Sequence, residues 1–522
     1  MKYFNVAGPC LEGIHYMIDA TERLYNELME LINSEQYYVI HAARQTGKTT
    51  LLIDLANKVN KESKYYAVYC SLENAYITPE PEKGIPVIIN SFVMALENHN
   101  MPNHDKFLEN INFDDYANAL GFALRNYCRK LDKPLVIFFD EADCLSDNTL
   151  LSFLRQLRNG YINRTFAPFP ISIALVGMRN IRDYKARIRE NQTSLGTASP
   201  FNIITKSLTL RNFTKKEVEN LYQQHTDQTG QVFEIEALEL IFAQTQGQPW
   251  LVNAIAREII IEQLKKDYSI PITSEMVSKA INAIILRRDV HIDQLLDKLK
   301  DTRVQKVIEE VILGEGDKIE RMSDDYCYVK DLGLIRDINK VIEPANPIYG
   351  EVIIRMLNFD KQMILETDER FSQYQMPKYY KNDVFDMTLM LKDFQKFWRE
   401  NSEIWQNKFQ YKEAAPHLIL QAFLQRVLNG GGDIRREMAT GRRRLDLCVE
   451  YLDKKYPIEL KIDKGKKYLE RGTEQLFKYM DTLGCKEGWL VSFDRNADKS
   501  WDDKIYHKTE TVNEKIVNIF GC

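Results

Sequence analysis

Several features are scarce or absent in this sequence of 522 residues. Its eight cysteines are scattered without a C-x-x-C pair, which argues against a disulfide framework or a zinc site and fits reduced thiols. No apolar run approaches the roughly 20 residues of a membrane span, and residues 1–13 lack the apolar core of a signal peptide. The net charge is only −5, so any basic surface must be local. We therefore expect a soluble, cytoplasmic protein without a membrane partner.

The stretch at residues 37–57 is the feature around which the chain is organised. A short apolar run leads into a loop and then into a helical pattern, and the loop fits G-x-x-x-x-G-K-[ST] except that Ala42 replaces the first glycine. Backbone N–H groups of such a loop bind nucleotide phosphates, a lysine adds positive charge, and a threonine hydroxyl binds Mg²⁺. The predicted ATP-binding residues of this loop are Ala42, Arg44, Gln45, Thr46, Gly47, Lys48, Thr49 and Thr50. The alternative is a chance Gly-Lys-Thr before an ordinary helix.

A second apolar run, PLVIFFDEAD at residues 134–143, ends in two carboxylates. In a parallel sheet, side chains that bind a ligand commonly lie at the carboxyl ends of buried strands, as these two carboxylates would. Downstream of a phosphate loop, the pattern predicts a Walker B element. We expect Asp140 to join Thr49 in holding Mg²⁺ and Glu141 to orient or deprotonate the attacking water.

Two further features extend the predicted nucleotide site. A buried strand at residues 171–176 precedes Arg179, which we expect near the γ-phosphate, with an exposed loop arginine as an equal alternative. Pro249 follows Gly247 at the start of a helix, a position that suits proline. Three more arginines are candidates for a finger toward a neighbouring subunit of a homo-oligomer: Arg182, Arg187 and Arg189.

Together these motifs resemble the bacterial AAA-like ATPases of the STAND/archaeal-type group, over about residues 1–350. The resemblance implies a helical lid in which the G-x-P turn of Gly247 and Pro249 closes over the nucleotide. It also implies a winged helix after the lid, with residues 326–335 and 341–347 as a strand–turn–strand wing. This region is acidic, which favours packing against the ATPase over contact with DNA.

A second chemical constellation lies in the last third of the chain. Residues 434–449 have the pattern of a β-hairpin, and a third strand follows at residues 456–462. The alternation of a strand places Glu459 and Lys461 on one face. Asp446 and Glu459 can then share a divalent metal, while Lys461 positions a water or stabilises charge on a phosphate.

This arrangement resembles the PD-(D/E)XK nuclease superfamily over about residues 390–522. Gln475 and Tyr479 supply the Q-x-x-x-Y pattern of its exonuclease- and recombination-type branch, which adds Gln475 to the predicted catalytic residues. Glu413 and Glu437 are candidates for the usual acid of the first helix. The resemblance implies a site for Mg²⁺ or Mn²⁺ and a nucleic-acid substrate, with DNA favoured. A surface hairpin with a chance Asp and Glu-Lys pair is the alternative.

Local charge supports a nucleic-acid partner. Residues 433–480 contain 13 Lys or Arg and nine Asp or Glu, a net charge of +4 in a chain of −5. Five arginines crowd the hairpin, where they could contact phosphates: Arg435, Arg436, Arg442, Arg443 and Arg444. A solvated charged hairpin would have the same composition.

The sequence as a whole predicts an α/β multidomain protein, a parallel-sheet P-loop ATPase joined to a restriction-endonuclease-like domain. The expected parts are the ATPase core at 1–205, the helical lid at 206–295, the winged helix at 296–360, a linker at 361–390 and the nuclease-like domain at 391–522. The expected function is an ATPase that controls a metal-dependent nuclease. The rivals are a STAND-like signalling NTPase that binds nucleic acid or protein without cleaving, and a mobile-element or anti-phage effector in which hydrolysis represses cleavage.

Overall fold

The computed structural model shows two compact units, unit 1 at residues 1–293 and 321–336 and unit 2 at residues 294–320 and 337–522. None of the helices in the described part of the chain is long and apolar enough to cross a membrane. The structure describes residues 1–19, 23–76, 78–177, 200–287, 289–312, 319–355, 376–381, 384–407, 415–428, 433–436, 439–440, 443–444, 447–451, 454–463, 466–494, 496, 498–512 and 514–522.

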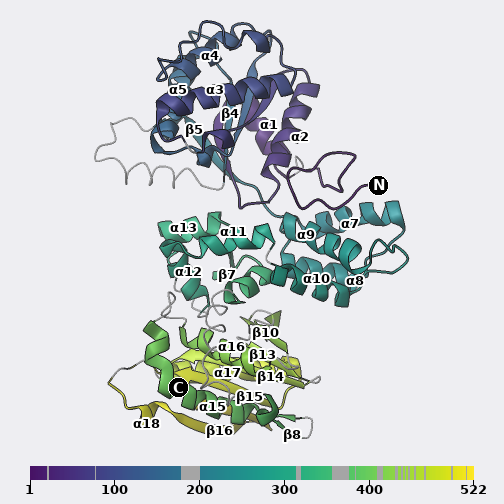
Figure 1. Ribbon diagram of the computed structural model, residues 1–522, viewed down its shortest axis with the longest axis vertical. Coiled ribbons are helices and arrows are strands. Elements are labelled where there is room, and N and C mark those ends of the chain that lie inside the picture. The colour runs from purple at the N-terminus through teal and green to yellow at the C-terminus, as the bar shows by residue number, and fades with distance from the viewer. Residues whose placement is uncertain are drawn as a thin grey trace. The chain divides into compact units, whose positions relative to one another are not determined.

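Unit 1 contains a parallel sheet of five strands in the order β2-β3-β4-β1-β5 (Figure 1). Its apolar strands are buried, as a parallel sheet covered on both faces requires. Strand β4 separates β1, which leads into the phosphate loop, from β3, which ends at Asp140. The strand bounds are β1 Tyr37–His41, β2 Tyr66–Ser71, β3 Leu135–Asp140, β4 Ser172–Gly177 and β5 Ile204–Thr209.

Helices cover both faces of this sheet. Helices α1 and α2 pack with one face in one apolar cluster, and α3, α4 and α5 pack with the other face in a second cluster (Figure 1). The sheet thereby holds its strand ends, where the motifs lie, in fixed positions. The helix bounds are α1 Tyr25–Asn33, α2 Lys48–Lys61, α3 Pro81–Asn98, α4 Ala119–Cys128 and α5 Asp147–Asn163, with short 3₁₀ turns η2 Glu73–Ala75, η3 His104–Lys106, η4 Ala142–Cys144 and η5 Pro200–Ile203.

The region predicted as a lid is helical, and local signals explain where its helices begin. Helix α7 starts at a capping box in which the Thr214 hydroxyl accepts from the Glu217 N–H and the Glu217 carboxylate accepts from the Thr214 N–H. Helix α9 starts with Pro249, and the Gln248 side chain accepts a 2.6 Å bond from the backbone of Leu251. The bounds are α7 Lys215–Thr229, α8 Ile235–Thr245, α9 Pro249–Arg257, the π-helix η6 Glu258–Gln263 and α10 Ser274–Arg287.

The predicted first strand of the wing, residues 326–335, is wrong, because most of it is helix. Helix α13 spans Asp324–Asp331, and strand β6 begins only at Ile335. The Ser323 hydroxyl caps α13 by accepting from the Tyr326 N–H at 3.2 Å, and acids in the first turn suit the helix N-terminus. These signals outweigh the strand propensity of the aromatic residues. The neighbouring elements are α11 Val290–Lys298, α12 Thr302–Ile312, β6 Ile335–Ile338 and β7 Val341–Pro344.

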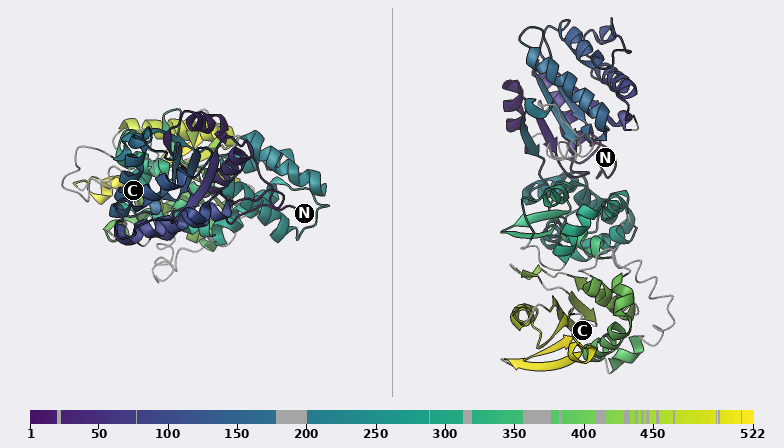
Figure 2. Two further views of the ribbon diagram at one scale, coloured as in Figure 1. Left: turned by 90° about the horizontal axis from the view of Figure 1, so that it is seen from above. Right: turned by 90° about the vertical axis from the view of Figure 1, so that its left-hand side faces the viewer.

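Unit 2 contains a mixed sheet of six strands in the order β10-β13-β14-β15-β17-β16. Strands β10, β13 and β14 are antiparallel, β14, β15 and β17 are parallel, and β16 runs antiparallel to β17 at the edge. The yellow arrows at the bottom of the right-hand view in Figure 2 belong to β16 and β17. The predicted hairpin is present, with Ile434 opposite Val449. The strand bounds are β10 Asp433–Arg436, β13 Leu447–Tyr451, β14 Lys454–Ile462, β15 Glu487–Phe493, β16 Tyr506–Val512 and β17 Lys515–Gly521.

Helices precede and connect these strands. The order α16, β10–β13, β14, α17 is the helix–hairpin–strand–helix order expected from the sequence. Helix α17 packs on the sheet through a buried cluster that includes Leu476, Tyr479, Met480 and Leu490. The remaining bounds are α15 Met387–Asn407, α16 Ala415–Leu428, α17 Lys466–Leu483 and α18 Trp501–Lys504, with the short pieces η8 Met376–Tyr379, β8 Tyr380–Lys381, β9 Val384–Phe385, β11 Ala439–Thr440 and β12 Arg443–Arg444.

Candidate functional site

The phosphate loop connects β1 to α2 and takes two residues through left-handed backbone conformations. Gln45 has φ 56° and Gly47 has φ 88°. Glycine adopts this left-handed conformation easily because it has no Cβ. The Thr46 hydroxyl donates to the carbonyl of Ala43 at 2.8 Å, which tightens the turn. The loop therefore presents the backbone of Gly47 and the start of α2 to one side, where N–H groups and the helix dipole favour an anion.

Lys48, the first residue of α2, is buried and held by the loop. Its ammonium donates to the carbonyl oxygens of Ala42 and Ala43, both at 2.9 Å. Burial lowers the pKa of Lys48, and the carboxylates of Glu141 and Asp140 oppose this shift. Two neutral carbonyls compensate the charge only partly, so phosphate oxygens arriving at the loop would be stronger partners for the ammonium.

Thr49 and Asp140 meet at the carboxyl end of the sheet. The Thr49 hydroxyl donates to Asp140 Oδ2 at 2.7 Å, and the Tyr69 hydroxyl donates to the same oxygen at 3.3 Å. Asp140 is only 1% exposed, and burial raises its pKa. A hydroxyl and a carboxylate at this spacing form the oxygen-rich set that Mg²⁺ prefers, so the residues present fit the predicted magnesium site.

Glu141 follows Asp140 in a left-handed conformation with φ 55°. Its backbone N–H donates to Asp140 Oδ1 at 2.9 Å. Burial raises the pKa of Glu141, and the charges of Asp140 and Asp143 raise it further. A carboxylate whose pKa is raised is a better proton acceptor near neutral pH than an ordinary one. The geometry thus fits the predicted roles of both acids.

A cavity of about 720 Å³ opens beside the phosphate loop, and we call it the loop cavity. Gln45 of the loop, Gly8 of the N-terminal segment, and Trp250 and His291 are among its lining residues. The rings of Trp250 and His291 stack with centroids 4.7 Å apart. Burial lowers the pKa of His291 to about 4. A flat aromatic wall next to a phosphate loop is suited to a nucleotide base.

Sequence reasoning missed two residues that hold the phosphate loop. Arg23 is buried and donates from Nη1 to the Thr46 carbonyl at 2.8 Å, and its Nε and Nη2 form no hydrogen bond among the described residues. Burial lowers its pKa to about 10. Gln248 reaches from the start of α9 to the Gln45 carbonyl at 3.4 Å. No local pattern marks Arg23, whereas Gln248 is the middle residue of the predicted G-x-P turn.

The G-x-P turn is built around a close backbone contact. Gly247 has φ 70°, and its carbonyl accepts from the N–H of Phe213 at 2.9 Å. A Cβ added at Gly247 would lie 1.9 Å from the Phe213 carbonyl oxygen, so only glycine fits. Pro249 starts α9, but the contact that the structure shows from this turn to the phosphate loop is made by Gln248 rather than Pro249.

Residues after the lid also contact the phosphate loop of unit 1. A Cβ added at Gly333, just beyond α13, would lie 2.3 Å from the Ala43 Cβ. The Asp331 carboxylate lies 3.5 Å from His41 Nε2 at the end of β1. The base of the loop is therefore packed by a segment that follows the lid by more than thirty residues of sequence.

Of the predicted nuclease residues, the structure describes Glu459, Lys461 and Gln475 in unit 2. Glu459 and Lys461 share a face of β14, as predicted, and Lys461 Nζ lies 2.7 Å from Glu459 Oε1. Glu459 is 1% exposed. Helix α17 lies close, because a Cβ added at Gly472 would meet the Lys461 Cγ at 3.1 Å. Gln475 is half-buried on α17, while Tyr479 belongs to the apolar cluster beneath it.

Other predicted site residues lie outside the described residues: Arg179, Glu413, Glu437 and Asp446, together with Arg182, Arg187, Arg189 and Arg442. Leu447, which follows Asp446 in the sequence, pairs with Ile458, which precedes Glu459. Among the residues that the structure does describe, no group of three or more His, Cys, Asp or Glu could hold a metal ion. The predicted pairing of Asp446 with Glu459 on a metal stays a prediction.

Comparisons with known proteins separate the two parts of the chain. Residues 21–353, more than half of the chain, match a family described as an AAA-like domain, and residues 378–497 match a "Domain of unknown function (DUF8371)". No curated protein matches the chain.

Three solved structures illustrate the similarity of the ATPase part. The Walker-type ATPase PABY2304 of Pyrococcus abyssi is 14% identical, with a TM-score of 0.47 over 67% of this chain and 99% of that chain. The RuvB Holliday junction branch migration motor of Thermotoga maritima is 12% identical, with a TM-score of 0.34 over 64% and 93%. Cdc6p from Pyrobaculum aerophilum is 14% identical, with a TM-score of 0.35 over 65% and 94%.

Proposed function

The chain belongs to the AAA-like domain family, and we propose that it binds and hydrolyses ATP with Mg²⁺ to control a metal-dependent PD-(D/E)XK nuclease in its C-terminal part. The observation that carries the ATPase half is the 2.7 Å contact between Thr49, at the start of α2 after the phosphate loop, and Asp140 at the end of β3. Two oxygen ligands, a buried lysine and a second acid converge there from motifs that are far apart in the sequence.

Each residue of the nucleotide site has a separate role in the proposed ATP hydrolysis. Lys48 exchanges its two carbonyl partners for phosphate oxygens, so its positive charge favours the nucleotide. Thr49 and Asp140 would hold Mg²⁺, which neutralises phosphate charge when bound. Glu141, with its raised pKa, orients the attacking water and accepts its proton. Trp250 and His291 form the wall against which the base packs.

The nuclease half of the proposal is supported by the buried acid on β14. A carboxylate that is 1% exposed is costly to bury unless it has a partner, and Lys461 is its partner at 2.7 Å. In the proposal Asp446 and Glu459 hold Mg²⁺ or Mn²⁺, Lys461 stabilises charge developing on a phosphate, and Gln475 assists from α17. The net charge of +4 over residues 433–480 favours nucleic acid, and DNA in the first place.

One observation favours a second candidate function. Glu459 and Lys461 form an ion pair with each other inside the protein, and buried ion pairs of this kind also occur in proteins where they have only a structural role. A STAND-like signalling or defence NTPase whose C-terminal part binds nucleic acid or protein without cleaving would keep this pair for its fold. The proposal also includes a winged helix, a homo-oligomer and an arginine finger. These three features are supported only by the sequence and its resemblance to the AAA-like ATPases.

The nuclease half is tested with the full-length protein and labelled duplex DNA, single-stranded DNA and RNA, each with Mg²⁺, Mn²⁺ or a chelator and with or without ATP. We expect metal-dependent cleavage that Lys461→Ala lowers at least about a hundredfold. Lys455→Ala is the matched control, because Lys455 is an exposed lysine on the same strand, 3.9 Å from Glu450. Undiminished cleavage by Lys461→Ala rejects the site, and absence of cleavage by the wild type on every substrate favours the second candidate.

A further inference from the structure

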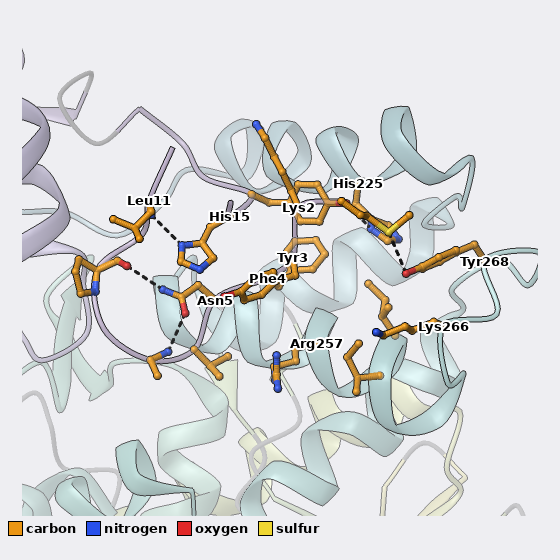
Figure 3. A pocket seen from close by; sticks show the side chains of 17 residues that line it. Lys2, Tyr3, Phe4, Asn5, Leu11, His15, His225, Arg257, Lys266 and Tyr268 are labelled. Carbon is orange, nitrogen blue, oxygen red and sulfur yellow. Dashed lines mark hydrogen bonds between the residues drawn. The ribbon is translucent and has the colours of Figure 1, made fainter. Parts of the chain in front are cut away.

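A second cavity, of about 790 Å³, lies in unit 1 between the N-terminal segment and the lid (Figure 3). We call it the N-terminal cavity. One side is formed by residues 1–16 and the other by α7, the end of α9, the π-helix η6 and the loop that follows it. Its volume lies within the usual range of small-molecule sites, about 300–1,000 Å³. No residue of the phosphate loop lines it.

Aromatic and aliphatic side chains form its walls. In the view of Figure 3, Tyr3 and Phe4 occupy the middle of the cavity, with His15 on one side and Tyr268 on the other. Tyr3 meets the His15 ring edge-on, with centroids 4.7 Å apart, and is nevertheless 46% exposed. Solvent-exposed aromatic surface inside a hollow is a common feature of ligand sites.

The polar groups within these walls are held in place. The Leu11 N–H donates to His15 Nδ1 at 2.8 Å. The Tyr16 hydroxyl donates to Gln228 Oε1 at 2.6 Å, and His225 Nδ1 lies 3.2 Å from the same hydroxyl. Burial lowers the pKa of His225 and thereby favours its neutral ring. These polar groups form hydrogen bonds within the protein. Selectivity for a ligand would therefore come from the apolar walls and from the rim of the cavity.

The rim of the N-terminal cavity carries charge of one sign. Lys2, Arg257 and Lys266 line it, and none of the described residues that line it is acidic. Figure 3 shows the three basic side chains around Tyr3 and Phe4. Three cations over an apolar hollow favour an anion whose body is apolar.

The acidic residues next in sequence to this rim have other partners. Glu258 lies 2.7 Å from Arg287 Nη1. Glu262 lies 3.3 Å from Lys265 Nζ. Asp267 Oδ1 accepts from the Ser269 hydroxyl at 2.6 Å. Glu258 and Glu262 are thus paired with basic side chains outside the rim, and Asp267 does not line the cavity, so no acidic residue of the described lining opposes the positive charge of the rim.

The backbone on the lid side has unusual conformations. The wall there is a π-helix, η6, and Lys265 and Lys266 both have left-handed φ values of 49° and 66°. The N–H of Lys266 donates to the Ile260 carbonyl at 2.8 Å, which fixes the turn that brings Lys266 to the rim. π-Helices occur frequently at functional sites, and strained backbone conformations can be retained there.

We propose that the N-terminal cavity is a binding site for a small organic anion with an aromatic body, separate from the nucleotide site. The aromatic walls take the body, and Lys2, Arg257 and Lys266 take the anionic group. The cavity shares Val6, Ala7 and Arg257 with the loop cavity, so the two ligands are neighbours. Lys266 lines the N-terminal cavity but not the loop cavity. A substitution at Lys266 can therefore test the first site without changing the lining of the second.

The probe is anilinonaphthalene sulfonate, an aromatic anion whose fluorescence rises in apolar surroundings, titrated into the full-length protein with saturating ADP. Phenylnaphthylamine, which has the same rings without the sulfonate, is the neutral probe. We expect one saturable sulfonate site per chain. Lys266→Gln should weaken it about two- to fivefold, the range expected for one exposed charge, and leave the neutral probe unchanged. Tyr3→Ala should weaken both probes.

Lys216→Gln is the matched control, because Lys216 is an exposed lysine on α7, the helix that also supplies His225, and does not line the cavity. It should leave the binding of both probes unchanged. Saturable sulfonate binding that is seen in a titration without ADP and is lost with saturating ADP would assign the probe to the loop cavity and overturn the proposal. Equal weakening by the two lysine variants, an unchanged affinity in Lys266→Gln, or the absence of saturable binding would overturn it as well.

Discussion

Glu141→Gln should separate ATP binding from ATP hydrolysis. The substitution keeps the shape of a half-buried side chain and removes only its ability to accept a proton. Asp140 keeps its contacts, because the 2.9 Å bond that it accepts comes from the backbone of Glu141 and the 2.7 Å bond comes from Thr49. The contacts of the magnesium ligands and the two carbonyl contacts of Lys48 therefore remain, and ATP affinity should stay within about twofold of the wild type.

The expected loss of hydrolysis follows from the role of a general base. A positioned base contributes about 10²- to 10⁴-fold to a rate, which corresponds to about 3–5 kcal/mol of activation free energy. Burial and two neighbouring carboxylates raise the pKa of Glu141 above its usual value of 4.5, so the wild-type rate should rise with pH through that raised pKa. In Glu141→Gln this limb of the profile should disappear.

The assay is steady-state phosphate release together with equilibrium binding of a fluorescent ATP analogue, each measured from pH 5 to pH 8. Glu73→Gln is the matched control, because Glu73 is an exposed acid beyond the end of the adjacent strand β2. The control should keep the wild-type rate. Hydrolysis by Glu141→Gln within about threefold of the wild type, or loss of its ATP binding, refutes the assigned role.

Lys48→Ala should weaken ATP binding and abolish hydrolysis, because it removes the buried charge that faces the phosphates; unchanged turnover would exclude the phosphate-loop assignment. Gly247→Ala should destabilise unit 1 by more than about 2 kcal/mol in a denaturation experiment, because its Cβ would lie 1.9 Å from the Phe213 carbonyl oxygen. Gly230→Ala, with φ 79° and no atom within 4 Å of the added Cβ, should cost only about 1 kcal/mol, and equal losses would reject the clash. Burial lowers the pKa of His291 from 6.5 to about 4, so its contribution, on the order of 3 kcal/mol, is present above pH 6.5 and is lost as the pH falls toward 4. The melting temperature should fall less over this range in His291→Phe than in the wild type, and equal falls would contradict the linkage.

The motifs that could be predicted from sequence are those whose chemistry is local. The phosphate loop carries its lysine, threonine and glycine within a few residues, and the acid pair directly follows an apolar strand. The alternation of β14 predicted that Glu459 and Lys461 share a face, and their 2.7 Å contact confirms it. In each case the spacing along one element determines the geometry, so no knowledge of the tertiary fold is needed.

The contacts that could not be predicted join distant parts of the chain. Arg23 binds the Thr46 carbonyl across 23 residues, and Trp250 Nε1 donates to the Val6 carbonyl at 2.9 Å across 244 residues. Packing of the whole unit creates these contacts, and no periodicity records them. The error at residues 326–335 has a local cause, because the helix cap at Ser323 outweighs the strand propensity of the aromatic residues that follow it.

Control of the C-terminal site by the nucleotide is the central claim, and one measurement tests it most directly. Cleavage of labelled duplex and single-stranded DNA is followed with Mg²⁺, with and without ATP, for the wild type, Lys48→Ala and Lys461→Ala. A ligand that binds one of two states more tightly shifts their balance, so ATP should change the wild-type cleavage rate, and we expect activation. Lys48→Ala should lose this dependence on ATP, and Lys461→Ala should lose cleavage while keeping ATP hydrolysis. Cleavage that is indifferent to both ATP and Lys48→Ala would contradict the claim and leave two unlinked sites on one chain.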